Sequence, residues 1–266
     1  MGGNNTDTAH RPAPDRKIAL SFSHVSKVFP DGTHALEDVT FSLEGGNFVT
    51  VVGPSGCGKS TLLRIASGLD RQSRGSVVSN THNVGYVFQD ATLMPWRTVQ
   101  KNVELLAELH GIDKPDRRRL AAEAIAKVGL EGFESHYPKA LSGGMKMRVS
   151  LARALTLKPP VFLFDEPFGA LDEINRERLN DETLELFMRE RFAALFITHS
   201  IYEAVFLSTR VLVMSERPGH IVGDFEIPFG YPRPHELRFE PSFAELTGAV
   251  SAALRGAFGA VRPTDG

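Results

Sequence analysis

The chain has 266 residues, of which 42% are hydrophobic and 23% are charged, a composition typical of a folded globular protein and unlike that of a disordered chain. Its 30 Lys and Arg side chains against 32 Asp and Glu give a net charge of −2, which offers no support for nonspecific nucleic-acid binding. The single cysteine, Cys57, excludes an intrachain disulfide framework and any multi-cysteine metal site.

Neither a membrane-spanning segment nor a secretory signal is visible in the sequence. No charge-free window of about 18 residues is present. Residues 1–17 are polar, contain Pro12 and Pro14 and lack the apolar stretch of a signal peptide, so we expect a disordered tail. We therefore expect a cytoplasmic protein whose contact with a membrane runs through a partner.

Strand patterns begin at Ile18 and continue through the first third of the chain. Val39, Phe41 and Leu43 alternate with polar residues, which predicts a half-buried strand, and the glycines at 45–46 indicate a turn. The further elements expected in this part are a buried strand over 48–52, a helix over 59–67 that ends at Gly68, and a short strand over 84–88.

Residues 90–155 have helical spacing and no strong strand pattern. Helices are expected over 102–110 and 117–128, ending at Gly111 and Gly129, and over 145–155. We interpret this stretch as a helical subdomain inserted between strands.

Strands return in the second half of the chain, over 161–164, 194–197 and 211–214, and residues 171–188 between them have the pattern of a charged, amphipathic helix. Strands alternating with helices indicate an α/β fold whose mainly parallel sheet is covered on both faces. Residues 217–266 are a Pro-containing extension, in which a helix is expected near 242–255.

The most specific motif is a glycine-rich loop between an apolar strand and a helix. It fits G-x-x-x-x-G-K-[ST] and consists of Gly53, Pro54, Ser55, Gly56, Cys57, Gly58, Lys59 and Ser60, followed by Thr61. Glycines let backbone N–H groups surround an anion, and the helix that follows adds the positive end of its dipole. We expect Lys59 to bind β- and γ-phosphate oxygens and Ser60 to ligate Mg²⁺. Cys57 occupies one of the variable positions of the motif, and we expect it to fill space and not to act as a nucleophile.

Two carboxylates end the apolar strand over 161–164. In a parallel sheet the carboxyl end of a strand faces the ligand crevice, which places Asp165 to hold Mg²⁺ and Glu166 to polarise a water that attacks the γ-phosphorus. The alternative is a strand that simply ends in solvated acids.

A second anion cradle precedes the helix pattern over 145–155. Ser142 is a good N-cap type, and Gly143 and Gly144 follow it at the start of the helix. One chain with a single Lys-bearing loop has no need of two cradles unless the second serves another copy.

Together these motifs resemble the nucleotide-binding subunits of ABC transporters, over roughly residues 18–240. The loop at 53–60 is similar to their Walker A motif, 161–166 to Walker B and 141–144 to the signature motif. The resemblance adds four residues, namely Gln89 as the Q-loop glutamine, Asp172 in the D-loop, His199 as the switch histidine and Phe29 as the aromatic that stacks on adenine. Taken alone, Gln89 would be interpreted as a surface residue, His199 as structural and Phe29 as part of the core. The place of Gln89 after a strand and before the helical insert, and that of His199 at the end of the apolar run 194–197, favour a functional role for these two.

The resemblance implies a fold and a domain organisation. The fold is an α/β P-loop NTPase (RecA-like) core with a mainly parallel sheet, an antiparallel β subdomain and an inserted α-helical subdomain. The divisions are a tail over 1–17, an ABC ATPase domain over 18–240 with its helical subdomain at about 90–155, and a C-terminal helical extension over 241–266.

The resemblance also implies a head-to-tail dimer that binds ATP and Mg²⁺ between its two copies. Each ATP would lie between Lys59 of one copy and the cradle at 142–144 of the other, with Asp172 acting across the interface. Gln89 would contact Mg²⁺ or the attacking water, and His199 would hydrogen-bond the γ-phosphate. The implied ATPase residues are Lys59, Gln89, Glu166 and His199, and the implied metal ligands are Ser60, Gln89 and Asp165.

Within the family, residues 90–99 (DATLMPWRTV) and 231–234 (YPRP) resemble ATPases of nitrate/sulfonate/taurine-type importers. Such a subunit has a membrane permease as partner and works indirectly with a periplasmic or lipoprotein solute-binding protein, at the inner face of the cell membrane. Leu93, Met94 and Trp96 form an apolar cluster beside a predicted loop, which we interpret as a groove for a permease helix. The alternative for this cluster is ordinary subdomain core.

Three other functions are less well supported by the sequence. A soluble ABC-type ATPase acting on DNA would carry a coiled coil between Lys59 and Asp165, where no heptad run is found, and ribosomal relatives usually carry two cassettes. A nucleotide kinase would not need the second cradle or the pair Glu166 and His199. A non-hydrolysing binding module would not need Lys59, Glu166 and His199 together.

Overall fold

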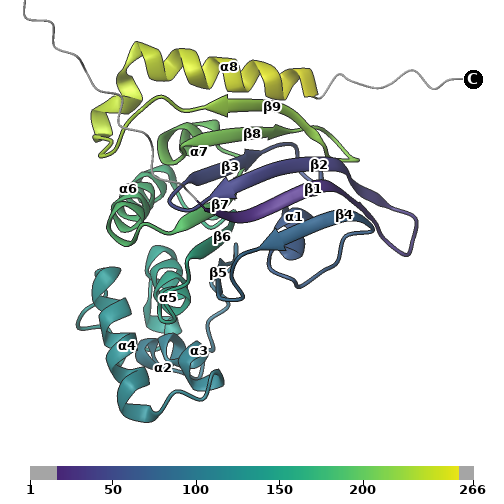
Figure 1. The fold of residues 1–266 in the computed structure, drawn as a ribbon. Helices are drawn as coiled ribbons and strands as arrows, with labels where there is room; N and C mark the ends of the chain where they lie inside the picture. The colour runs from purple at the N-terminus through teal and green to yellow at the C-terminus, as the bar shows by residue number, and fades with distance from the viewer. Residues whose placement is uncertain (1–16, 258–266) are drawn as a thin grey trace, which may run out of the picture.

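The structure, a computed structural model, describes residues 17–257. A six-stranded sheet in the order β5-β6-β7-β3-β8-β9 forms its centre (Figure 1). The strands are β3 (Phe48–Val52), β5 (Val84–Val87), β6 (Val161–Asp165), β7 (Ala193–Thr198), β8 (Arg210–Met214) and β9 (Ile221–Glu226). All neighbours are parallel except β8 and β9. The mainly parallel α/β fold expected from the sequence is confirmed.

A second, antiparallel sheet in the order β2-β1-β4 lies against one face of the first. It comprises β1 (Ile18–Val28), β2 (His34–Glu44) and β4 (Arg74–Ser79). Helix α1 (Lys59–Ala66) packs between the two sheets, where it contacts β6 and β7 on one side and β2 and β4 on the other. Leu62 and Leu63 of α1 are fully buried in the core between the sheets.

The other face of the central sheet is covered by helices. These are α5 (Gly143–Leu155), α6 (Glu173–Glu190), α7 (Ile201–Leu207) and α8 (Pro241–Ala257). Phe48, Phe164 and Phe196 project from adjacent strands into this second core, with ring centroids 5.5 to 6.3 Å apart. Helix α8 lies along β8 and β9 and buries Phe243 and Val250, so the C-terminal helix is packed on the sheet (Figure 1).

Helices gather beyond the β5 edge, where they are coloured teal in Figure 1. They are α2 (Val99–Val103), α3 (Leu105–Leu109) and α4 (Lys114–Lys127), which pack with α5. The 3₁₀ turn η1 (Pro138–Ala140) precedes α5, and the 3₁₀ turn η2 (His235–Phe239) precedes α8 and contacts it. The prediction of a single helix over 102–110 was wrong, because this stretch is divided between α2 and α3. The two short helices meet at Glu104, whose buried carboxylate is paired with Lys101 and Arg117. The N-cap Thr98 also starts α2 earlier than expected, because its side chain accepts a hydrogen bond from Lys101 N.

Some expectations fall on residues that the structure does not describe. The expected disordered tail lies outside the described residues except for Lys17, and so does the end of the C-terminal extension, 258–266. Within residues 17–257, no helix is both long enough and apolar enough to cross a bilayer.

Candidate functional site

The glycine-rich loop connects the buried strand β3 to helix α1. Gly58 has φ of 108°, and a Cβ at this position would lie 2.7 Å from the Ala35 carbonyl oxygen. A side chain is therefore excluded there by both the backbone conformation and the close approach of β2. Gly58 precedes α1 directly, so the loop delivers free backbone N–H groups at a helix N-terminus, which suits an anion.

Lys59 is buried, with only 4% of its surface exposed, inside this loop. Its Nζ donates to the carbonyl oxygens of Gly53 and Pro54, at 2.9 Å each. The nearest carboxylate oxygen is Glu166 Oε1, 3.9 Å away. The ammonium charge is thus held by dipoles of the loop and not neutralised by a close ion pair, which leaves it available to phosphate oxygens.

Cys57 is buried beneath the loop. Its Sγ lies 4.0 Å from Lys59 Nζ, and burial raises the pKa of the thiol. A raised pKa keeps the thiol protonated, which agrees with the role of filler and not with that of a nucleophile. Ser55 and Gly56 are exposed, and Thr61, in the first turn of α1, is half-buried.

Oxygen ligands meet between the start of α1 and the end of β6. Ser60 Oγ donates to Asp165 Oδ1 at 2.9 Å, although the two residues are 105 positions apart in sequence. A hydroxyl and a carboxylate are ligands that Mg²⁺ prefers, and this ion is usually completed by phosphates and water. Among residues 17–257 there is no cluster of three or more His, Cys, Asp or Glu side chains suited to a metal ion.

Tyr86 was not predicted as a site residue. Its hydroxyl donates to Asp165 Oδ2 at 3.3 Å, and burial together with the Asp165 charge raises the pKa of Tyr86. The hydroxyl therefore stays protonated and orients the second oxygen of the carboxylate. The sequence carries no local signal for this contact, because Tyr86 and Asp165 are 79 positions apart.

Glu166 and His199 lie together at the carboxyl ends of β6 and β7. Glu166 Oε1 is 2.7 Å from His199 Nε2, so the imidazole presents its Nε2 proton to the carboxylate. Glu166 has φ of 47°, and its N–H donates to Ile197 O at 3.0 Å. This left-handed conformation turns the side chain away from the path of the strand and toward Lys59 and His199.

Gln89 follows β5 and is exposed. Gly169 lies in the turn after Glu166 and is close to both Glu166 and Gln89. A Cβ placed on Gly169 would lie 3.9 Å from Gln89 Nε2 and 3.9 Å from Glu166 Cβ. Gln89 thus borders the turn that follows Glu166. The structure therefore brings Lys59, Ser60, Asp165, Glu166, His199 and Gln89 to the same end of the parallel sheet.

Phe29 comes directly after β1 and is half-buried in a turn closed by its N–H to Thr33 O at 2.9 Å. Lys27 Nζ lies 5.0 Å from the centroid of its ring. The ring is partly accessible, and no described contact joins it to the glycine-rich loop. Stacking of Phe29 on adenine stays a prediction.

The second cradle lies on a different part of the chain. Ser142 is the N-cap of α5, where its Oγ accepts from Met145 N at 3.3 Å, and Ser142 and Gly143 are exposed. Helix α5 contacts α2, α3, α4 and β5, whereas α1 contacts neither α5 nor these helices to a comparable extent. The two cradles are therefore built on separate layers of the molecule (Figure 1).

Asp172 is the N-cap of α6. Its carboxylate accepts from the side chain and the backbone N–H of Asn175, and these hydrogen bonds lower the pKa of Asp172. The neighbouring Ile174 is 81% exposed, so this end of α6 presents both a charge and an apolar side chain to the outside. Residues 231–234 are structural, because Arg233 is buried and donates to the carbonyl oxygens of Val205, Phe206, Ser208 and Phe229.

Arg217 is a second contact that sequence reasoning missed. Its Nε and Nη2 donate to the Gly56 carbonyl oxygen at 3.0 and 2.7 Å. No local pattern predicts this contact, because the two residues are 161 positions apart.

The fold and the converging side chains define a nucleotide-binding P-loop protein, and the comparisons with known proteins specify its family. A family model described as ABC transporter matches residues 36–169. An uncharacterized ABC transporter ATP-binding protein of Methanocaldococcus jannaschii is 45% identical over 227 residues, covering 82% of this chain and 85% of the relative. An aliphatic sulfonates import ATP-binding protein of Bacillus cereus is 42% identical over 243 residues, covering 88% and 94%. The chain belongs to the ABC transporter family, as an ATP-binding ATPase.

Solved structures agree with this assignment. A dimeric structure of a bacterial ABC transporter cassette is similar with a TM-score of 0.68 and 30% identity, covering 79% of this chain and 100% of that one. The structure of cbiO1 from Clostridium perfringens has a TM-score of 0.74 over 90% of this chain, and at 24% identity it supports the fold alone.

Proposed function

We propose that this chain is the ATP-hydrolysing subunit of an importer, in which two copies close on two ATP molecules and drive a small nitrate-, sulfonate- or taurine-like solute through a separate membrane permease. The observation that carries the proposal is the convergence of Lys59, Ser60, Asp165 and Glu166 with His199, while the cradle at 142–144 lies on another layer. The sulfonate import relatives support the solute class.

The chain's own residues divide the work of hydrolysis. Lys59 and the loop N–H groups would bind the phosphates, and Ser60, Asp165 and Gln89 would hold Mg²⁺, which would supply charge neutralisation at the phosphates. Glu166 orients the attacking water and receives its proton, because its carboxylate is the basic group nearest to Lys59. His199 fixes Glu166 through the 2.7 Å contact, and it would hydrogen-bond the γ-phosphate when nucleotide is bound.

A second copy completes each site. Ser142 and Gly143 are exposed at the N-terminus of α5, and this positive helix end is suited to the γ-phosphate bound by the partner's loop. Asp172 and the exposed Ile174 lie at the N-terminus of α6, where they would contact the partner. The dimeric structure of a similar cassette supports this assembly.

The permease surface includes Trp96, which is 72% exposed, in the connection after Gln89. Leu93 and Met94 are half-buried beside it, and Leu93 packs on the helix-covered core. Trp96 is thus the one member of this cluster that is mostly free for a partner. Through the permease the subunit would sit at the inner face of the membrane and serve a periplasmic or lipoprotein solute-binding protein.

The shared site is tested by complementation. Ser142→Arg should abolish ATPase activity, and so should Lys59→Ala. An equal mixture of the two should recover at most about a quarter of the wild-type rate, because half of the dimers are mixed and each mixed dimer has one intact site. Ser76→Arg, on the exposed strand β4, is the matched control and should keep wild-type activity. Full activity of Ser142→Arg alone would exclude the shared site.

A further inference from the structure

The connection from β5 to α2, residues 88–98, carries both Gln89 and Trp96 but has little regular structure of its own. Within the described residues, the main-chain hydrogen bond that begins and ends inside this connection runs from Arg97 N to Met94 O, at 3.0 Å. Gln89, Thr92 and Trp96 are all exposed. Backbone pairing and the partial burial of Leu93 and Met94 therefore leave much of its shape to be fixed by contacts from other elements.

Arg153 of α5 holds the first part of the connection. Its guanidinium donates to Ala91 O at 2.9 Å, to Thr92 O at 3.1 Å and to Thr92 Oγ1 at 3.1 Å. Arg153 is 8% exposed, and among residues 17–257 no carboxylate forms an ion pair with it. Burial lowers the pKa of Arg153. A buried charge compensated only by carbonyl and hydroxyl oxygens fixes those oxygens in place, because leaving them unpaired is costly.

Thr92 has a backbone conformation that needs such support. Its φ is 46°, in the left-handed region that β-branched residues seldom adopt. Strain of this kind persists only where surrounding contacts over-determine it. Here two of the three bonds from Arg153 to the connection end on Thr92 itself.

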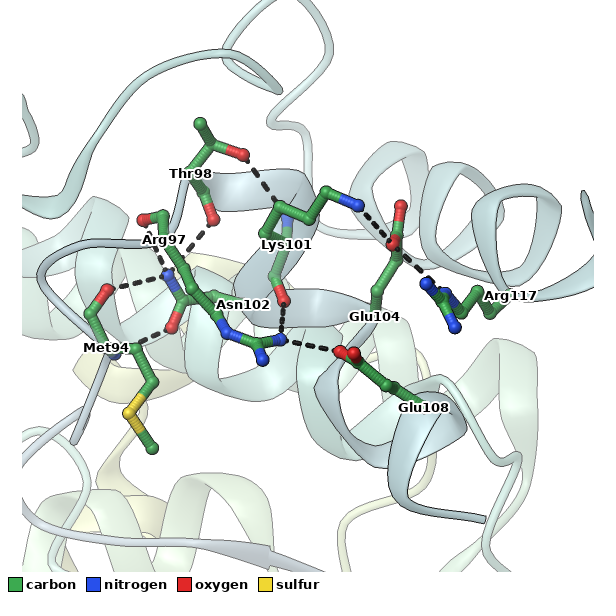
Figure 2. A network of polar contacts seen from close by, with 8 residues as sticks. All are labelled: Met94, Arg97, Thr98, Lys101, Asn102, Glu104, Glu108 and Arg117. Atoms are coloured by element: carbon green, nitrogen blue, oxygen red, sulfur yellow. Dashed lines mark hydrogen bonds and ion pairs between the residues drawn. The ribbon is translucent and has the colours of Figure 1, made fainter. Parts of the chain in front are cut away.

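Asn102 of α2 holds the second part. It is fully buried, and Figure 2 shows its amide pointing into the turn made by Met94, Arg97 and Thr98. Its Oδ1 accepts from Met94 N at 2.7 Å, and its Nδ2 donates to the carbonyl oxygens of Met94, Arg97 and Thr98 at 3.2, 2.9 and 3.0 Å. Only an amide can serve a donor and several acceptors at once, so Asp or Leu would leave buried groups unpaired or opposed.

Ion pairs join the helices around Asn102 to one another and to the end of the connection. Arg97 pairs with Glu108 of α3 at 2.7 Å, and the fully buried Glu104 pairs with Lys101 at 3.1 Å and with Arg117 of α4 at 3.5 Å (Figure 2). The end of the connection is thereby part of the same rigid group as α2, α3 and α4.

We propose that Arg153 and Asn102 are positioning residues that make the connection a stiff arm of the helical part, so that Gln89, Trp96 and the cradle at 142–144 move as one body. Ser142 and Arg153 lie on the same helix, eleven residues or about 16 Å apart at 1.5 Å per residue. Arg153 therefore ties the nucleotide-facing start of the connection to the helix that begins with the cradle. This inference rests on the proposed function for the roles of Gln89 and the cradle, and not for the stiffness of the arm.

The stiffness can be measured directly because Trp96 is the single tryptophan of the chain. In the full-length protein, time-resolved fluorescence anisotropy should show Trp96 with restricted local motion. Arg153→Met and Asn102→Leu should each at least double the amplitude of the fast local decay. Arg148→Met is the matched control, since Arg148 is on the same helix but is bonded to Glu182, and it should leave the Trp96 decay unchanged.

ATPase kinetics test the consequence for the site. Arg153→Met should lower kcat at least tenfold while nucleotide affinity stays within about twofold, since the glycine-rich loop is untouched, and Arg153→Lys should restore part of kcat. Should either core variant not fold, Thr92→Gly serves instead, because Thr92 is exposed. It removes the hydroxyl and the restriction on φ, and it should raise Trp96 mobility and lower kcat without lowering the melting temperature.

The outcomes separate the two proposals. Wild-type anisotropy and wild-type kcat in Arg153→Met or Thr92→Gly would overturn the stiff arm. Increased mobility in these variants with an unchanged kcat would overturn its coupling to the site. A wild-type protein without ATPase activity would refute the proposed function, and the anisotropy result would still decide the stiffness.

Discussion

Replacing Arg217 tests how the phosphate loop is held in shape before nucleotide arrives. Arg217 lies between β8 and β9, and its side chain donates two hydrogen bonds to the carbonyl oxygen of Gly56. Gly219 of the same connection packs so closely that a Cβ there would lie 2.1 Å from Cys57 O. The connection between β8 and β9 thus supports the phosphate loop in two ways, through the hydrogen bonds of Arg217 and through the close packing of Gly219. Arg217→Ala removes the first of these.

The size of the effect follows from geometry and exposure. Hydrogen bonds from a charged donor contribute about 1.5–3 kcal/mol when they are shielded from water. Arg217 is exposed, so water replaces part of the interaction and about 1 kcal/mol is expected here. Because 1.4 kcal/mol corresponds to a factor of ten, ATP should bind about fivefold more weakly. The value of kcat should change by less than about twofold, since Lys59 and Glu166 are untouched.

Titration with a fluorescent ATP analogue and steady-state kinetics, each at low and high salt, measure these effects. If Arg217 acts by bracing the loop, the loss should be the same at both salt concentrations, and Arg217→Lys should recover only part of it. If Arg217 acts as a distant charge on the phosphates, Arg217→Lys should bind like wild type and the loss should vanish at high salt. Arg210→Ala, which breaks a surface pair with Asp224, is the control. Unchanged affinity in Arg217→Ala would refute the bracing argument.

The remaining predictions concern turnover, the permease and stability. Glu166→Gln should bind ATP with near wild-type affinity but lose almost all turnover, and sizing chromatography with ATP should then capture a dimer; full activity would remove Glu166 from its role. Trp96→Glu should weaken co-purification with the permease while sparing ATP binding, and unchanged co-purification would reject this surface. Burial raises the pKa of Glu203, so its folded form keeps a proton that the unfolded chain releases, and stability falls as pH rises above the usual glutamate range. Glu203→Gln should therefore raise the melting temperature more at pH 8 than at pH 5, and an equal shift at both would contradict this.

The sequence predicted those parts of the fold and site in which local signals dominate. Strands β3, β6 and β7 were recognisable as apolar runs because both faces of a parallel sheet are buried. Ser142 was predicted as an N-cap from its type and from the glycines that follow, and its Oγ accepts from Met145 N. The pairing of Glu166 with His199 follows from both residues standing at carboxyl ends of neighbouring parallel strands.

Other features could not be predicted because their partners are distant in sequence. Strand β9 has no fully buried residue, so its pattern lacks the apolar signal, and it forms by pairing with β8. Arg217 and Tyr86 are ordinary residues until the fold brings them to Gly56 and Asp165. The break at Glu104 depends on an arginine in another helix, which no spacing rule contains.

Two of the six non-glycine residues with positive φ in residues 17–257 lie in loops that follow adjacent strands of the central sheet. Thr92, beyond β5, and Glu166, at the end of β6, both adopt left-handed conformations that cost about 1–2 kcal/mol for residues other than glycine. Each is held by a contact from elsewhere in the fold, Thr92 by Arg153 and Glu166 by the carbonyl oxygen of Ile197. The strain places Glu166 against Lys59 and His199, and it directs the arm that begins at Gln89 toward α5. Because these contacts come from α5 and from β7, the arm that begins at Gln89 and the carboxylate of Glu166 are each positioned by a neighbouring element and not by their own loop alone.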